Sequence, residues 1–190
     1  HLDLIKLNQE ISKDYDNTPT NINLNTFTDL NKKIFEYPTD FTINSRLKRI
    51  LERKQNITET KSKLDWSHAE LLALGSIIKE GKNIRLTGQD TERGTFSQRH
   101  AVLHDINNGN KFIPLNNLYT EQPKIMIKNS PLTEMATLAF EYGYTLLDSN
   151  NSLVLWEAQF GDFVNNAQSI IDEYISSGYS KWGIKSSLIM

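Results

Sequence analysis

Apolar residues recur at spacings of three and four in two stretches near the start of the chain, residues 27–35 and residues 43–51. This spacing puts the apolar side chains on one face, so it predicts two amphipathic helices. Pro38 separates the two stretches. Residues 12–25 are rich in Asn, Thr and Asp and predict a loop.

The pattern changes to an alternation of helix and strand later in the chain. Ser67, followed three residues later by Glu70, fits a capping box and predicts a helix over residues 67–80, which Gly81 should stop. Short segments rich in Ile, Leu and Val then predict strands, and a fourth strand should begin near the end of the chain. The expected strands are 83–87, 124–128, 153–156 and 188–190.

Two further helices are expected between these strands. Ser130 as N-cap and Pro131 in the first turn begin a helix over residues 132–146, and the apolar positions of residues 163–175 predict another that closes at Gly178. The alternation predicts an α/β fold in which a parallel sheet is flanked by helices and preceded by a helical segment. Ligands of such sheets bind beyond the carboxyl ends of the strands, so the following loops should carry the chemistry.

Composition narrows the classes of function. The chain has 190 residues, 38% of them apolar, and its formal charge of −2 offers no broad basic surface for nucleic acid. The absence of cysteine excludes disulfides, thiolate zinc sites and cysteine nucleophiles. No apolar run approaches the roughly 20 residues that cross a bilayer, so we expect no membrane partner.

The two parts of the chain differ in composition. Basic side chains outnumber acidic ones in residues 1–64, the reverse holds from residue 65 on, and all nine glycines lie at Gly75 or later. We therefore divide the chain into a helical linker segment, 1–64, and a domain, 65–190. The chain begins with His1 rather than Met and ends on an apolar run, so we expect it to be part of a longer protein.

Each of the three expected loops offers candidate residues, and each has a structural alternative. Gln89 and His100 lie in a polar loop that either grips an acidic small molecule or is an ordinary surface loop. Glu134 either performs acid/base work or complements the dipole of its helix. Phe160 and Phe163 either line a pocket for a flat heterocycle or pack in the core.

Two other residue pairs are weaker candidates for acid/base catalysis or metal binding. Glu141 follows Glu134 by seven residues, which separates two helical residues by about 10 Å. His100 and His104 lack a third ligand, so no metal site is expected within this chain.

Several longer motifs, in one order along residues 65–190, carry a specific resemblance. They are Asp65-Trp66, Ala69-Glu70, Arg85-Leu86-Thr87-Gly88-Gln89-Asp90, Arg93-Gly94-Thr95-Phe96, Arg99-His100-Ala101-Val102-Leu103-His104, Phe140-Glu141-Tyr142-Gly143-Tyr144 and Trp156-Glu157-Ala158-Gln159-Phe160-Gly161-Asp162-Phe163. This part of the chain resembles the transketolase-like pyrimidine-binding domain of the thiamine-diphosphate-dependent 2-oxoglutarate dehydrogenase family. Residues 26–64 resemble the preceding helical segment only loosely, and residues 1–25 carry no signature.

The resemblance implies roles for the candidates. Glu134 stands in the place of the cofactor-activating glutamate, whose carboxylate favours the pyrimidine tautomer that accepts a proton from the thiazolium ring. Phe160 and Phe163 are implied in the apolar pocket around the pyrimidine, and Gln89 near the substrate. With His100, Gln89 is expected to act on the acidic substrate or on an incoming lipoyl arm.

The resemblance also implies an activity and partners for the parent protein. It would decarboxylate 2-oxoglutarate and pass the succinyl group to the lipoyl domain of dihydrolipoyl succinyltransferase, as a homodimer. It would lie in the cytoplasm if bacterial or in the mitochondrial matrix if eukaryotic. A 2-oxoadipate dehydrogenase and a non-catalytic assembly module of the same fold remain alternatives.

The chain departs from the family pattern in two places. The Gly-Asp-Gly motif that holds the magnesium ion of the diphosphate is absent, and the sequence ends before the family's proline-histidine-glycine segment. We therefore expect the domain to be truncated on its C-terminal side, Mg to be bound by another part of the parent, and the 190-residue chain alone to be inactive.

Overall fold

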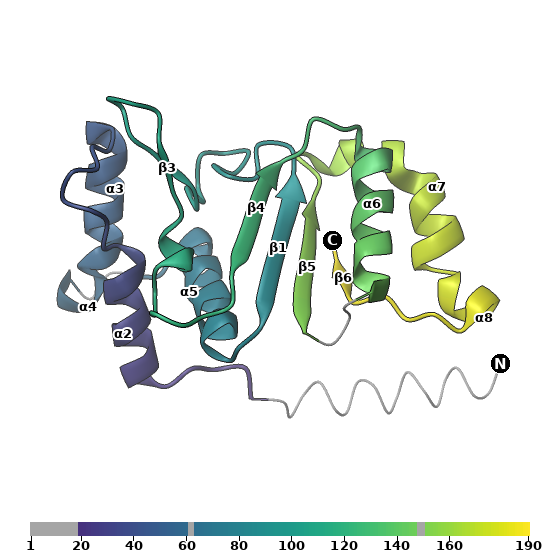
Figure 1. The fold of residues 1–190 in the computed structure, drawn as a ribbon, viewed down its shortest axis with the longest axis horizontal. Coiled ribbons are helices and arrows are strands. Elements are labelled where there is room, and N and C mark those ends of the chain that lie inside the picture. The colour runs from purple at the N-terminus through teal and green to yellow at the C-terminus, as the bar shows by residue number, and fades with distance from the viewer. Residues whose placement is uncertain (1–18, 61–62, 148–150) are drawn as a thin grey trace.

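The computed structural model describes residues 19–60, 63–147 and 151–190. Its centre is a four-stranded sheet in the order β4-β1-β5-β6, with every neighbouring pair parallel (Figure 1). The strands are β1 (Asn83–Gly88), β4 (Ile125–Asn129), β5 (Ser152–Glu157) and β6 (Leu188–Ile189). The predicted parallel sheet is confirmed, and the ends of the strands differ from the prediction by at most one residue.

Side chains of β1 alternate between two helical layers. Ile84 and Leu86 enter the larger apolar core, which they share with α5 (Trp66–Lys79), whereas Arg85 contacts α6 (Glu134–Leu147) on the opposite face. Figure 1 shows α5 and α2 on one side of the sheet and α6 with α7 on the other. The predicted flanking of the sheet by helices is confirmed.

The helical segment before the sheet contains α2 (Leu24–Ile34), α3 (Ser45–Gln55) and the short α4 (Ile57–Thr60). Asn23 and Asn44 cap α2 and α3 by accepting hydrogen bonds from backbone amides. The loop predicted for residues 12–25 is therefore wrong at its end, because α2 begins at Leu24. Residues 12–18 of that prediction lie outside the described residues. Apolar residues of α2 and α3 share one core with α5 and β1, so packing continues across the expected boundary at residue 64.

The predicted capping box of α5 is wrong. Asp65, not Ser67, caps the helix, since its carboxylate accepts a hydrogen bond from the His68 amide at 2.8 Å. Ser67 is buried and binds Lys54 instead, at 2.5 Å between Oγ and Nζ. A carboxylate two residues earlier thus outcompetes the serine for the free amides of the first turn.

The start of α6 also differs from the prediction. The helix begins at Glu134, and Ser130 shapes the preceding turn by accepting a hydrogen bond from the Leu132 amide at 3.2 Å. The Ser130 hydroxyl also contacts the Thr137 hydroxyl at 2.9 Å. Ser130 is therefore not the N-cap, and Pro131 lies outside the first turn.

The predicted helix after β5 is a mixed segment, namely the 3₁₀ helix η2 (Gly161–Ala167), a short α7 (Gln168–Ile170) and a π-helical turn η3 (Ile171–Ile175). The hydroxyls of Ser176 and Ser177 donate to main-chain carbonyls four and five residues earlier and widen the last turn. Gly178 does not end the segment but begins α8 (Gly178–Trp182).

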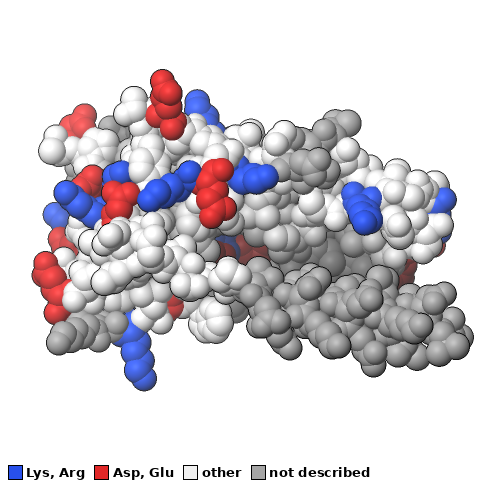
Figure 2. Space-filling view, turned by 90° about the horizontal axis from the view of Figure 1, so that it is seen from below, with Lys and Arg blue, Asp and Glu red and all other residues white. Residues whose placement is uncertain are grey.

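The long loop between β1 and β4 contains structure that the sequence did not reveal. A short antiparallel hairpin pairs β2 (Leu103–His104) with β3 (Lys111–Phe112), and the 3₁₀ turn η1 (Pro114–Asn116) follows. Within the described residues, no helix is long and apolar enough to span a membrane. Basic and acidic side chains are interspersed on the face shown in Figure 2.

Candidate active site

The path of the chain across the parallel sheet changes direction after β4. The chain moves from β1 to its neighbour β4, then crosses back to β5 on the other side of β1. The carboxyl ends of β1 and β5 therefore form the kind of crevice where open α/β sheets bind ligands. Gly88 and Glu157 are the last paired residues of these strands.

The close approach of the two strand ends requires glycine. A Cβ on Gly88 would lie 2.2 Å from the Glu157 carbonyl oxygen and 2.7 Å from the Thr91 hydroxyl, and Gly88 has φ +153°. Any side chain would push the loops apart. Gly88 thus brings the loop after β1 against the loop after β5.

The loop after β1 is held in an unusual backbone conformation. Asp90, Ser97 and His100 have φ of 55°, 53° and 48°, although none is glycine. Such conformations cost free energy and persist only where surrounding contacts impose them. Gln89, the first residue of this loop, is half-buried, and its amide group forms no hydrogen bond with the residues that the structure describes.

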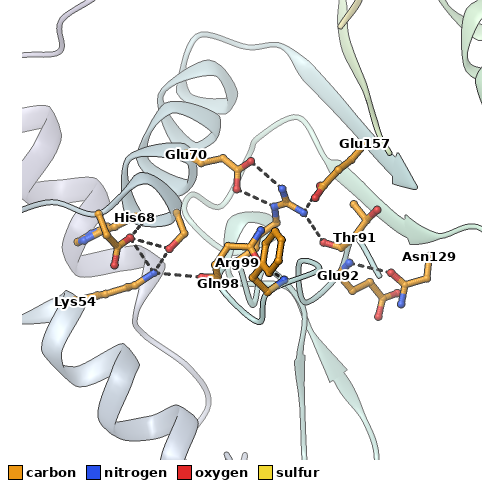
Figure 3. Close-up of polar contacts among 12 residues, drawn as sticks. Lys54, His68, Glu70, Thr91, Glu92, Gln98, Arg99, Asn129 and Glu157 are labelled. Atoms are coloured by element: carbon orange, nitrogen blue, oxygen red, sulfur yellow. Dashed lines mark hydrogen bonds and ion pairs between the residues drawn. The ribbon is translucent and has the colours of Figure 1, made fainter. Parts of the chain in front are cut away.

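Arg99 ties this loop to the scaffold (Figure 3). Its guanidinium binds both carboxylate oxygens of Glu70 at 2.8 and 3.0 Å, Glu157 Oε2 at 2.5 Å and the Thr91 carbonyl at 2.9 Å. Burial lowers the pKa of Arg99, but the hydrogen bonds and charges of Glu70 and Glu157 outweigh burial and raise it. Arg99 therefore joins α5, the loop and β5.

A second polar cluster lies beneath the same loop, at the left of Figure 3. Lys54 is buried, and its ammonium binds Ser67, Asp65 at 3.4 Å and the Gln98 carbonyl at 3.5 Å. Burial lowers the pKa of Lys54, while Asp65 opposes that shift. Lys54 thus connects the helical segment to the loop after β1.

His100 is more buried than we expect of a residue that acts on the substrate or the lipoyl arm. It is half-buried and lines a small apolar cavity with Phe35, Leu71 and Ala101. Burial lowers the pKa of His100, and the positive charges of Lys54 and Arg93 lower it further, against a backbone hydrogen bond at Ser97. The structure therefore places the His100 side chain against this apolar cavity and Gln89 at the start of the loop.

Glu134 stands at the first position of α6, where the helix dipole favours a negative charge. Its side chain is half-buried, and its carboxylate has no hydrogen bond or ion pair with other described residues. Glu141 is different, because it is 1% exposed and both its oxygens bind Arg85, at 2.6 and 2.9 Å. Arg85 thus neutralises Glu141, and the two carboxylates do not form an acid/base pair.

Phe160 and Phe163 form an exposed aromatic cluster with Phe96. The Phe160 ring packs edge to face against Phe163 at 5.5 Å and against Phe96 at 5.9 Å between ring centroids. Exposed fractions of 44% for Phe160, 37% for Phe163 and 77% for Phe96 show that they are not core residues. Sequence reasoning gave Phe96 no role, although its motif Gly94-Thr95-Phe96 was part of the resemblance.

The 3₁₀ helix η2, which contains Phe163, packs against the helix that carries Glu134. Leu138 of α6, Trp156 of β5 and Ala167 of η2 form one small apolar core, which holds η2 against α6. An open hollow of about 500 Å³ adjoins it, lined by Arg99, Glu157 and other residues at the carboxyl ends of the strands. No group of three or more His, Asp or Glu side chains in the described part of the chain is arranged to hold a metal ion.

This parallel sheet, with a carboxylate and an aromatic cluster beyond its carboxyl edge, matches a known domain class. The profile described as "Transketolase, pyrimidine binding domain" matches residues 62–190, so the chain belongs to that family and the resemblance is confirmed.

The chain is also similar to curated proteins called "2-oxoglutarate dehydrogenase E1 component". It is 48% identical to that of Geobacillus sp. (strain WCH70) over 171 residues, 90% of this chain and 18% of the relative. With that of Bacillus subtilis (strain 168) it shares 46% identity over 186 residues, 98% of this chain and 20% of the relative. The "2-oxoglutarate dehydrogenase, mitochondrial" of Schizosaccharomyces pombe is 46% identical over 172 residues, 90% of this chain and 17% of the relative. The chain thus spans about a fifth of the length of these relatives.

Proposed function

We propose that this chain is the pyrimidine-binding part of a thiamine-diphosphate-dependent 2-oxoglutarate dehydrogenase E1 component. The observation that carries the proposal is the Glu134 carboxylate, half-buried at the start of α6 and without a partner among the described residues. A carboxylate in this position is ready to accept a hydrogen bond from a ligand. Sequence identity of 42–48% to proteins of that name supports the same proposal.

The residues at the carboxyl edge fit the pyrimidine end of the cofactor. When bound, thiamine diphosphate supplies the nucleophilic carbon for decarboxylation of a 2-oxo acid. Glu134 would hold a proton shared with a pyrimidine ring nitrogen, and Phe160 and Phe163 would pack against the ring and exclude water. The magnesium ion and the diphosphate would be held by other parts of the parent protein.

The substrate in this proposal is 2-oxoglutarate. The free amide of Gln89 would donate to a substrate oxygen at the mouth of the crevice. His100, later in the same loop, would act on the substrate or the lipoyl arm. The succinyl group would pass to the lipoyl domain of dihydrolipoyl succinyltransferase.

The oligomeric state and the cellular compartment of the parent protein are part of the same proposal. It would be a homodimer, in the cytoplasm if bacterial and in the mitochondrial matrix if eukaryotic. It would bind neither nucleic acid nor a membrane.

A 2-oxoadipate dehydrogenase is the nearest alternative, since the two substrates differ by one methylene, worth about 1–3 kcal/mol in a pocket. A non-catalytic assembly module of the same fold is the alternative from another class. Neither is favoured by a contact among the described residues.

A substrate comparison on the full-length protein that contains this chain tests the proposal. Decarboxylation of 2-oxoglutarate and 2-oxoadipate is measured with thiamine diphosphate and Mg²⁺ present. The proposal predicts a kcat/KM about tenfold or more higher for 2-oxoglutarate, the scale that one methylene supports. Preference for 2-oxoadipate would establish the first alternative, and no turnover of either acid, with cofactor bound, would establish the second.

A further inference from the structure

The Asp90 side chain makes a direct hydrogen bond between the two loops that meet at the candidate active site. Asp90, in the loop after β1, accepts a hydrogen bond on Oδ2 from the Gln159 side-chain amide at 2.6 Å. Gln159 lies 69 residues later, in the loop after β5. The Thr95 hydroxyl donates to the Gln159 main-chain carbonyl at 3.1 Å, so a second contact between the loops ends on the same residue.

The backbone at Asp90 is shaped for this contact. Its φ of 55° is costly for a residue with a side chain, although Asp tolerates this conformation better than most. The Asp90 carbonyl accepts a hydrogen bond from the Gly94 amide at 2.7 Å, which closes the turn. The turn aims the Asp90 carboxylate at the loop after β5 rather than at its own strand.

The contact with Gln159 is the principal one that the Asp90 side chain makes. Arg93 also binds Asp90 Oδ2, at 3.1 Å, but both side chains of that pair are nearly half exposed, and such ion pairs contribute little. A short hydrogen bond from an amide to a carboxylate is charge-assisted and stronger than a neutral one. The Asp90 contact with Gln159 therefore adds a direct side-chain hydrogen bond between the loops to the Arg99–Glu157 ion pair and the Phe96–Phe160 ring contact.

Asp90 and Gln159 are each adjacent in sequence to a residue of the candidate site. Gln89 immediately precedes Asp90, and Phe160 immediately follows Gln159. We propose that Asp90 is a positioning residue that fixes the loop after β1 to the loop after β5 and thereby fixes Gln89 relative to Phe160. The catalytic meaning of this inference rests on the proposed function, whereas the tie between the loops does not.

Reversing the polarity of the hydrogen bond tests the proposal in the full-length protein. Gln159→Glu places a carboxylate against Asp90 and breaks the contact. The double variant Asp90→Asn, Gln159→Glu restores it with donor and acceptor exchanged, because the amide introduced at position 90 can donate to the new carboxylate. Arg93→Gln is the control, since it removes the exposed ion pair with Asp90 and the local Arg93 hydrogen bond to the Gly94 carbonyl but leaves the Asp90–Gln159 contact in place.

Amide hydrogen exchange without cofactor is the first measurement. We expect Gln159→Glu to exchange about fivefold or more faster in residues 89–96 and 158–163, and the double variant to return to within about twofold of wild type. Arg93→Gln should resemble wild type. Unchanged exchange in Gln159→Glu, or no recovery in the double variant, would overturn the proposed tie.

Calorimetric titration with thiamine diphosphate and Mg²⁺ is the second measurement. The dissociation constant should rise about tenfold in Gln159→Glu and recover in the double variant. Equal affinity of Gln159→Glu and wild type would overturn the positioning role. If exchange behaves as expected but wild type binds no cofactor, the proposed function fails while the tie between the loops stands.

Discussion

Gly88 lies so close to Glu157 that a single methyl group on it would overlap the Glu157 carbonyl oxygen, at 2.2 Å. This close approach lies at the last paired position of the two strands whose ends form the candidate site. Because the overlapping atom belongs to the main chain of a central strand, it cannot move aside as a flexible side chain would.

Gly88→Ala should therefore destabilise the protein by roughly 2 kcal/mol or more, through overlap and backbone strain. Gly143→Ala is the matched control, because Gly143 lies in α6 and a Cβ there meets no atom within 4 Å. That change should be neutral or stabilising by up to about 1 kcal/mol. Urea unfolding of both variants measures the difference, and similar stabilities would refute the argument from close approach.

The buried imidazole of His68 predicts a pH dependence of stability. Burial, assisted by the positive charge of Lys54, lowers the pKa of His68 to about 4, and Asp65 opposes the shift. The folded state then binds a proton less readily than the unfolded state, whose pKa is about 6.5. The stabilisation is complete above the unfolded pKa and is lost as the pH falls from about 6.5 toward about 4.

Between pH 7 and pH 5 this group alone should cost about 2 kcal/mol of unfolding free energy. His68→Asn removes the titrating group and should flatten that part of the profile, even though the contact of His68 with Asn31 at 2.7 Å is lost. His100, whose pKa is also lowered, retains its share of the slope. An unchanged slope in His68→Asn would contradict the assignment.

Much of the scaffold was predictable because its signals are local. Ile84 and Leu86 alternate with Arg85, residues 125–127 form a short apolar run, and both patterns lie in strands that were expected. Helix starts were less predictable, because Asp65 and Ser67 are both good caps. The sequence does not show that Asp65 accepts from the His68 amide while Ser67 binds the buried Lys54.

The candidate site was predictable only where the family resemblance supplied it. Glu134 and Phe160 were expected from motifs, and the structure places both beyond the carboxyl edge, but their roles stay predictions. The Asp90 contact with Gln159 joins residues 69 positions apart, and the Arg99 contact with Glu70 joins residues 29 apart. Neither follows from periodicity or spacing, because each depends on how the loops fold together.

Phe160→Ala in the full-length protein should weaken binding of thiamine diphosphate. Removing the ring takes away packing area, and full burial of an aromatic side chain is worth roughly 2–3 kcal/mol, so an increase of about 10- to 100-fold in the dissociation constant is expected. Tyr179→Ala is a suitable control, because Tyr179 is 61% exposed and lies on α8, away from the aromatic cluster. Equal cofactor affinity of Phe160→Ala and wild type would remove Phe160 from the pocket.

Gln89→Ala and His100→Ala should have different effects on kinetics and on thermal stability. Gln89 has a free amide, so its loss should raise the KM for the 2-oxo acid about tenfold and leave the thermal midpoint unchanged. His100 lines an apolar cavity, so His100→Ala should lower the midpoint as well as activity. Steady-state kinetics and thermal unfolding of both variants test this, and unaltered kinetics in both would make the loop purely structural.

The central claim is that Glu134 acts on the cofactor rather than only on the helix dipole. Turnover of 2-oxoglutarate by full-length Glu134→Gln tests it most directly, with Glu121→Gln, an exposed glutamate before β4, as control. The proposed role predicts a fall in turnover of about 10² or more with an unchanged thermal midpoint and a normal control. Near-normal turnover, with a stability loss below about 1 kcal/mol, would contradict it and leave Glu134 as a complement to the helix dipole.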